Sequence, residues 1–244
     1  MHRFIVEAGL RAGCVAALGA DDARHALRVL RLRAGDRVQL SDGAGALFEA
    51  VLERADDAGV YARVGDRLPS GEPGVRVTIY QGLPKADKLD LIVQKATELG
   101  AARVVPVKME RSVVRLDEKD GEKRRQRLSK IAREAAKQCG RACVTEVLAP
   151  VGFERALDML SREDAALMPW ENAREDGFKR AWSERPGAAS VGILIGPEGG
   201  ISEAEALSAA KAGAMPVTLG PRILRTETAA IVCCALAMHL WGDI

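Results

Sequence analysis

The residues best suited to bind a ligand lie in two Gly-Pro loops near the carboxyl-terminal end of the chain. The first, Gly196–Gly200, has the sequence GPEGG and follows an apolar run, Val191–Ile195. Glycine lets the backbone approach a ligand closely, and the Glu198 carboxylate can accept hydrogen bonds from hydroxyl or amine groups. Ser202 is expected to cap the helix that follows. Taken alone, this pattern fits a ligand loop and a tight strand-to-helix turn equally well.

A second loop of the same kind favours the ligand site. It begins at Leu219-Gly220-Pro221, after a short apolar strand over residues 216–219, and leads into a helix that Thr226 is expected to cap. Loops at the carboxyl ends of neighbouring strands form one crevice, the usual position of a ligand in an open α/β sheet. Neither loop matches G-x-G-x-x-G or the P-loop pattern, which disfavours those two nucleotide-binding folds.

The elements that would position these loops begin after residue 74. Apolar patterns predict strands at residues 75–80, 103–107, 144–148 and 165–169, and helices at residues 87–99, 122–139 and 153–160. This alternation indicates a parallel sheet with crossover helices, an α/β domain over residues 75–244. A final helix at residues 227–240 is apolar on every face, so it is expected to be buried in a core or against another subunit.

A different pattern occupies residues 1–70. Short segments that alternate in hydrophobicity, at residues 3–6, 37–40, 45–52 and 59–64, are separated by turns and accompanied by one helix at residues 22–30. This pattern predicts a small β-barrel. The run Pro69–Gly74, rich in Pro and Gly, is expected to link it to the α/β domain.

Composition disfavours several classes of protein. The chain has no apolar stretch long enough to span a membrane, and no signal-peptide core follows its charged N-terminus. The five cysteines form no C-x-x-C pair, and the three histidines have no ligand spacing. We therefore expect buried, reduced thiols in a cytoplasmic protein that has no metal site.

Basic residues are unevenly distributed, although the net charge is only +2. Residues 103–141 hold 13 Lys and Arg against 6 Asp and Glu, whereas residues 1–74 hold 10 Arg, no Lys, and 11 Asp and Glu. Arg24, Arg28 and Arg31 recur at helical spacing beside His25, either as a solvated helix face or as contacts to phosphates. Because no aromatic residues are interleaved with these cations for stacking on bases, nucleic-acid binding would depend on phosphates and shape.

The two loops, GPEGG and LGPRILRTETA, resemble the cofactor-binding end of the SPOUT (trefoil-knotted) methyltransferases, and most of all the ribosomal RNA small subunit methyltransferase E family. The resemblance extends over nearly the whole chain. It includes Met1–Phe4, His25–Arg31, Gly35-Asp36, Ser41–Gly43, Gln81–Lys85, Lys95–Gly100 and Arg133–Cys139. Each segment is a weak signal alone, but their order is highly specific.

The resemblance implies a PUA-like RNA-binding β-barrel over residues 1–70 and a SPOUT methyltransferase domain over residues 75–244 with a C-terminal trefoil knot. Nothing in the sequence pattern itself shows a knot. The family transfers a methyl group from S-adenosylmethionine to N3 of a uridine, uridine 1498, in 16S rRNA. The resemblance therefore implies 16S rRNA in the assembled small ribosomal subunit as the partner. It also implies a cytoplasmic homodimer without a metal ion or membrane contact.

On the same resemblance, the cofactor is expected to contact both loops and the end of the strand before them. The expected contacts are Trp170, Glu171, Ile195, Gly196, Pro197, Glu198, Gly199, Gly200, Leu219, Gly220, Ile223, Leu224, Arg225 and Thr228. Arg225 is expected to stabilise the uracil anion, and Glu198 to lie beside the cofactor or the uracil edge. The expected RNA contacts are Arg3, Arg24, His25, Arg28 and Arg31.

Alternatives remain open at this stage. Arg225 could instead pair with Glu227 or bond to a backbone carbonyl, and Trp170 could simply be packing. No side chain stands out as a strong general base. The chain could also be a SPOUT ribose 2′-O-methyltransferase, or a non-catalytic RNA-binding protein whose α/β domain is a dimer scaffold.

Overall fold

The computed structural model describes residues 1–6, 9–173 and 177–244, and the chain divides into two compact units. The first unit contains Met1–Glu72 and Ala136–Val144, and the second contains Pro73–Ala135 and Thr145–Ile244. Each unit has its own sheet. Residues 136–144 thus group with the first unit, although they lie far from it along the chain.

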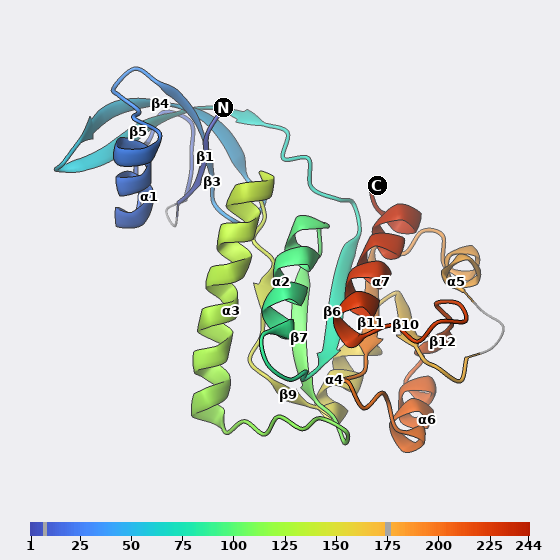
Figure 1. Ribbon diagram of the computed structural model, residues 1–244. Coiled ribbons are helices and arrows are strands. Elements are labelled where there is room, and N and C mark those ends of the chain that lie inside the picture. The colour runs from blue at the N-terminus through green and yellow to red at the C-terminus, as the bar shows by residue number, and fades with distance from the viewer. Residues whose placement is uncertain (7–8, 174–176) are drawn as a thin grey trace. The chain divides into compact units, whose positions relative to one another are not determined.

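The first unit is built on a five-stranded curled sheet (Figure 1). Its strands, in the spatial order β1-β3-β4-β5-β2, are β1 (Arg3–Ile5), β2 (Val15–Ala17), β3 (Arg37–Ser41), β4 (Leu47–Asp56) and β5 (Gly59–Leu68). β1 is parallel to β3, and the other pairs are antiparallel. The alternating segments therefore form β structure as predicted, and closure into a barrel stays a prediction.

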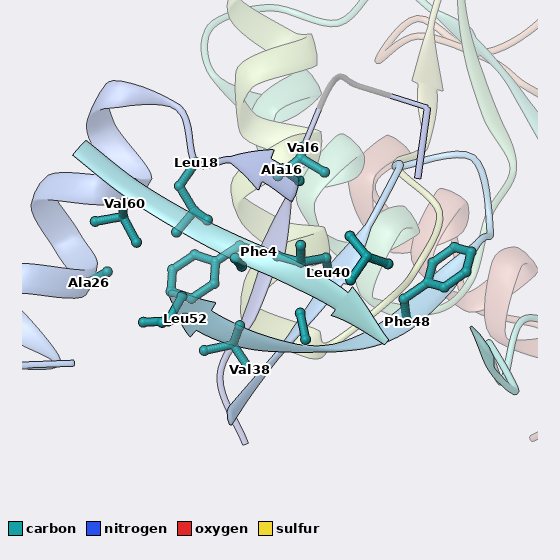
Figure 2. Close-up of a cluster of buried hydrophobic side chains, with 13 residues drawn as sticks. Phe4, Val6, Ala16, Leu18, Ala26, Val38, Leu40, Phe48, Leu52 and Val60 are labelled. Atoms are coloured by element: carbon teal, nitrogen blue, oxygen red, sulfur yellow. The ribbon is translucent and has the colours of Figure 1, made fainter. Parts of the chain in front are cut away.

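Alternate residues of the long strands point into one core, which is the arrangement that a period-two pattern predicts. They meet buried residues from β1, β2 and the helix of this unit (Figure 2). The cluster consists of Phe4, Val6, Ala16, Leu18, Ala26, Val38, Leu40, Phe48, Ala50, Leu52, Val60, Ala62 and Val64.

The helix predicted at residues 22–30 forms, but it is not one regular α-helix. α1 (Ala20–Arg24) continues into a π-helical turn, η1 (His25–Val29), and Arg31 lies beyond it with a positive φ of 56°. A π turn holds more residues than an α turn, so α-helical spacing does not carry across it. The prediction that Arg24, Arg28 and Arg31 share one α-helical face is therefore wrong.

The expected linker contains a residue that is firmly held. The Glu72 carboxylate accepts hydrogen bonds from the backbone N–H groups of Ala142 (2.7 Å) and Cys143 (2.9 Å). It also pairs with Arg141 at 2.8 Å, and the Arg141 side chain is only 11% exposed. Charge-assisted bonds of this kind hold residues 141–143 within the first unit.

The second unit contains a seven-stranded sheet whose pairs are all parallel. Its order is β12-β10-β11-β6-β7-β8, with β9 also paired to β7. The strands are β6 (Arg76–Gly82), β7 (Arg103–Lys108), β8 (Glu146–Val147), β9 (Val151–Gly152), β10 (Ala165–Pro169), β11 (Ser190–Ile195) and β12 (Met215–Val217). All of β11 is buried, as expected for a strand covered on both faces. The expected parallel α/β sheet is confirmed.

The helices after β6 are shown in Figure 1. They are α2 (Lys88–Glu98), α3 (Glu118–Cys139), α4 (Phe153–Leu160), α5 (Phe178–Glu184), α6 (Glu203–Lys211) and α7 (Thr226–Trp241). Each predicted helix appears within a few residues of its expected bounds, and α5 is additional. None of the helices in the described ranges has the length and apolar character needed to cross a membrane.

α7 is the apolar helix predicted at residues 227–240, and it contacts α2, α5, β6 and β11. Cys233 and Cys234 are fully buried on it, whereas Ile231 and Leu236 are half-buried. The five cysteines are all free, as expected. Cys139 is exposed, however, so the prediction that the thiols are all buried is wrong.

Candidate functional site

Three segments that leave the carboxyl edge of the second sheet surround a cavity of about 960 Å³. β10 pairs in parallel with β11 on one side and with β12 on the other, so the segments that follow these strands lie next to one another. The cavity is lined from residues 169–173 after β10, 195–201 after β11 and 218–226 after β12. Lys88 of α2 and Ala229 of α7 complete the lining.

Both Gly-Pro loops line this one cavity, although β10 lies between their strands in the sheet. Thirteen of the fourteen residues expected around a cofactor line it. The exception is Thr228, which is exposed on α7 and is not among the described lining residues.

The first loop has no room for side chains at two of its glycines. A Cβ on Gly196 would lie 2.9 Å from the carbonyl carbon of Gly200, and a Cβ on Gly199 would lie 2.9 Å from the Cβ of Arg111. Arg111 also donates a hydrogen bond from Nη1 to the Gly199 carbonyl oxygen at 3.0 Å. The glycines are therefore required by the packing of the loop itself, in addition to any need for close approach to a ligand.

Thr226 connects the start of α7 to the first loop. Its Oγ1 donates to the Gly196 carbonyl oxygen (2.6 Å) and accepts from Nε2 of Gln81 at the end of β6 (2.9 Å). The predicted N-cap role of Thr226 is wrong, because the N-cap position is Arg225 and the Thr226 hydroxyl bonds outside its own helix. Ser202, in contrast, caps α6 as predicted and forms a capping box with Glu205.

Charges of opposite sign meet in the cavity lining. Lys88 Nζ lies 2.9 Å from Oε1 of Glu198 and 3.5 Å from Oε2 of Glu227, and the Glu198 oxygen also accepts the backbone N–H of Lys85 (3.0 Å). Partial burial opposes ionisation of Glu198, but the bonds from Lys88 and from backbone N–H groups outweigh it and lower the pKa of the carboxyl. Glu198 is therefore a carboxylate at neutral pH and a weak proton acceptor.

Two groups in the lining have no partner among the described residues. The exposed Arg225 guanidinium makes no described hydrogen bond or ion pair, and Glu227, its expected alternative partner, faces Lys88 instead. The Trp170 Nε1 atom is buried and has no hydrogen-bond partner. A free cation and a free donor beside one cavity can stabilise negative charge that develops on a bound ligand.

The residues expected to contact RNA lie in the first unit and are spread over it. Arg3 donates to a side-chain amide at 2.9 Å and to a backbone carbonyl. Arg24 and Arg28 each pair with an aspartate, at 3.4 and 3.1 Å, and His25 and Arg31 are exposed. Because exposed ion pairs contribute little free energy, Arg24 and Arg28 can exchange their aspartates for another anion.

Sequence reasoning missed Gln81, Lys88 and Arg111, which shape the site. All three lie near strand ends, the first two around the end of β6 and Arg111 after β7. The rule that ligands bind at the carboxyl ends of parallel strands applies to these segments too. In the part of the chain that the structure describes, no group of three His, Cys, Asp or Glu side chains is placed to hold a metal ion.

Two family models match the chain. A model described as an RNA methyltransferase domain matches residues 71–238, and a model described as an RNA methyltransferase PUA domain matches residues 18–65. The first covers more than half of the chain and every residue that lines the cavity.

Individual relatives agree with these models. A protein of Bacillus subtilis named ribosomal RNA small subunit methyltransferase E is 36% identical over 86% of this chain and 84% of its own length. A protein of the same name from Mycobacterium bovis is 35% identical over 94% and 88%. A solved structure of that name from Neisseria gonorrhoeae, bound to S-adenosyl methionine, is 34% identical with a TM-score of 0.89, covering 100% of this chain and 99% of the other.

Proposed function

The chain belongs to the ribosomal RNA small subunit methyltransferase E family and is an S-adenosylmethionine-dependent rRNA methyltransferase. From that premise we propose that it methylates N3 of a single uridine in 16S rRNA. The observation that carries the proposal is one cavity bounded by both glycine loops, with Arg225, which has no partner among the described residues, in its lining. The choice of uridine follows the family.

The residues of the cavity fit S-adenosylmethionine. A volume of about 960 Å³ lies within the range of small-molecule pockets, roughly 300–1,000 Å³. Trp170 offers a buried donor that no described residue bonds, and Glu171 and Glu198 offer acceptors for hydroxyl and amino groups. We assign the thirteen lining residues named above to the cofactor site and leave Thr228 outside it.

The reaction requires that a weak acid lose its proton. Little of the N3 anion of uracil exists at neutral pH, so the enzyme must help the proton leave and stabilise the charge that spreads onto O2 and O4. The cofactor, when bound, supplies a methyl group on a sulfonium, and the sulfur leaves as a neutral thioether. Holding N3 in line with that methyl group can supply much of the acceleration.

Arg225 and Glu198 take separate roles in this proposal. Arg225 presents a permanently charged, planar cation that no described carboxylate neutralises, which suits the uracil anion. Glu198 uses Oε1 for Lys88 and the backbone of Lys85, which leaves Oε2 to accept a bond from the cofactor or from the uracil N3–H. Because its pKa is lowered, Glu198 orients these groups and is not the final proton acceptor.

We also assign to the chain the C-terminal trefoil knot and the homodimer of the family. The bond from Thr226 to Gly196 supports the knot, because it ties the end of the chain to the first loop. The half-buried apolar residues Ile231 and Leu236 of α7 support the dimer, because they offer a surface for a second copy. Action on the small ribosomal subunit would place the enzyme in the cytoplasm.

Residues 1–70 form the RNA-binding part of the proposal, and residues 75–244 form the catalytic part. Arg24, His25, Arg28 and Arg31 lie inside the segment that matches the PUA model, and Arg3 lies just before it. Their exposed or readily exchanged contacts support a role in binding rRNA phosphates.

Mass spectrometry of nucleosides from modified rRNA tests the proposal. Incubation of 16S rRNA, or of small subunits that contain it, with the enzyme and S-adenosylmethionine should yield 3-methyluridine. Formation of 2′-O-methyluridine would instead show a ribose methyltransferase. Calorimetry that detects no binding of S-adenosylmethionine would favour a non-catalytic RNA-binding protein.

A further inference from the structure

A second hollow in the catalytic unit is basic and separate from the cavity described above. It has a volume of about 420 Å³ and is lined by Ala86, Asp87, Lys123, Arg124 and Arg127. The first two belong to the loop before α2 and the other three to α3, and these two helices lie side by side (Figure 1). Three cations therefore line a hollow that contains one carboxylate.

Arg124 is the cation whose charge is least compensated. Its Nε is buried and has no hydrogen-bond partner among the described residues, and its Nη2 makes a long bond of 3.4 Å to the Ala86 carbonyl oxygen. Burial lowers the pKa of Arg124, and Arg127 lowers it further, while Asp90 and Asp87 oppose both effects. An additional anion in the hollow would give the buried Nε–H an acceptor and balance the charge.

The other two cations differ in how they are held. Arg127 is paired with Asp90 through both terminal nitrogens, one of them at 2.8 Å. Within the described ranges, Lys123 makes one ion-pair contact, an exposed one of 3.8 Å to Asp120. Lys123 and Arg124 are therefore the residues available to a ligand, and a guanidinium fork beside a mobile ammonium suits a phosphate group.

The hollow lies next to the methyl-transfer cavity, with one loop between them. The backbone N–H of Lys85 bonds to Glu198 in the cavity lining, and the carbonyl of the following residue, Ala86, receives the bond from Arg124. Ala86 has a positive φ of 51°, which is uncommon for a residue other than glycine. Because Lys85 and Ala86 are consecutive, an anion bound in the hollow would contact the loop that also bonds to Glu198.

We propose that this hollow binds a backbone phosphate of the substrate RNA close to the methylated nucleotide, with Arg124 and Lys123 as its ligands. The inference rests on the proposed function, since it takes the substrate to be RNA. The local excess of cations over residues 103–141 agrees with a polyanionic partner.

The test is the binding of 16S rRNA to the full chain over a series of salt concentrations. Arg124→Gln and Lys123→Gln are compared with Lys211→Gln, an exposed lysine of α6 outside both hollows that undergoes the same change in charge. Each of the first two variants should weaken binding about tenfold and reduce the slope of log K against log salt by about 0.7–0.9. S-adenosylmethionine affinity should be unchanged, and Lys211→Gln should behave as wild type.

Different failures have different meanings. Wild-type slopes in both variants, with methylation by the wild type intact, would overturn the phosphate site alone. Loss of binding in Arg124→Gln with a lower melting temperature, beside a normal Lys123→Gln, would also overturn it, because Arg124 would then only support the loop. A wild-type chain that neither binds nor methylates 16S rRNA would overturn the proposed function together with this inference.

Discussion

The two Gly-Pro loops line the same cavity, but the protein holds them in different ways. The loop after β11 is fixed by the Thr226 hydroxyl and by Arg111, and Gly196 has no space for a Cβ. In the loop after β12, Gly220 faces open space and the Ile223 side chain is 86% exposed. Segments with few contacts lie at the low-stability end of a structure. One wall of the cavity is therefore preformed, and the other can adjust to what binds.

The largest effect is expected from a methyl group added to the preformed loop. In Gly196→Ala, the new Cβ would meet the Gly200 carbonyl carbon at 2.9 Å, so the backbone must move. Overpacking of this kind costs about 3 kcal/mol, and the loop relieves it by leaving the geometry that binds the ligand. Binding must then restore that geometry, so the S-adenosylmethionine affinity measured by calorimetry should fall by more than about 100-fold.

Gly220→Ala is the matched variant in the second loop. It has open space but a φ of +93°, so it should suffer only backbone strain of about 1 kcal/mol and a loss of about fivefold. Equal losses in the two variants would contradict the difference between the loops.

An effect smaller than that of Gly196→Ala, and on turnover alone, is expected from Arg225→Ala at the end of the second loop. Removal of one group that stabilises a developing anion lowers kcat by about 100-fold. Binding of S-adenosylmethionine should change little, because Arg225 makes no described bond that supports the cavity wall. Single-turnover methylation of 16S rRNA measures the effect, Arg225→Lys should recover part of it, and unaltered turnover would remove Arg225 from the mechanism.

Thr226→Val should weaken the preformed loop without changing its shape. The isosteric side chain leaves the Gly196 carbonyl and an N–H of Gln81 without the hydroxyl that now bonds to both, at a cost of about 1–3 kcal/mol. Thermal unfolding should occur about 2–12 °C lower. Thr228→Val, two residues along on the exposed side of α7, should unfold as the wild type does. Identical midpoints for the two variants would show that the bridge contributes nothing.

The smallest expected effect is a change in pH dependence after Lys88→Met. Glu198 has a lowered pKa, so its ion pair contributes fully above the ordinary value of 4.5 and is lost as pH falls through the folded-state pKa. Lys88 has a raised pKa, so the pair is lost at the alkaline end only above 10.5. Without the bond and the charge of Lys88, the effect of burial is less compensated, so the pKa of Glu198 is higher than in the wild type.

Calorimetry of S-adenosylmethionine binding between about pH 4 and pH 8 measures this change. The acid-side loss of affinity should begin at a higher pH in Lys88→Met. Lys85→Met keeps the backbone N–H that bonds to Glu198 and changes only an exposed side chain, so its profile should match the wild type. A wild-type profile in Lys88→Met would contradict the prediction, because it would show that the ion pair between Lys88 and Glu198 does not affect ligand binding.

Features of the fold that depend on nearby residues were predictable from the sequence. α4 and β10 have the bounds that periodicity predicts, and Ser202 caps its helix with a partner three residues away. The π-helical turn at His25–Val29 was not predictable, because its residues have ordinary helix-forming character and tertiary packing decides the turn.

The candidate site also combines local features, which the sequence predicts, with long-range contacts, which it does not. Glycine at the strand ends predicted the loops and their common cavity, since that pattern is local. The choice of Thr226 between its own helix and a carbonyl 30 residues earlier was not predictable, and neither was the ion pair between Lys88 and Glu198. Both depend on segments that only the folded sheet brings together.

The hydrogen bond from Gln81 to Thr226 joins positions that are 145 apart in the chain. During translation, the inner strand that carries Gln81 leaves the ribosome long before its partner has been synthesised. Closure of the cavity by this hydrogen bond must therefore wait until residue 226 has been synthesised. A polypeptide released before residue 226 can assemble its inner strands and still lack the start of α7, which lines the cavity, so it should be inert toward rRNA.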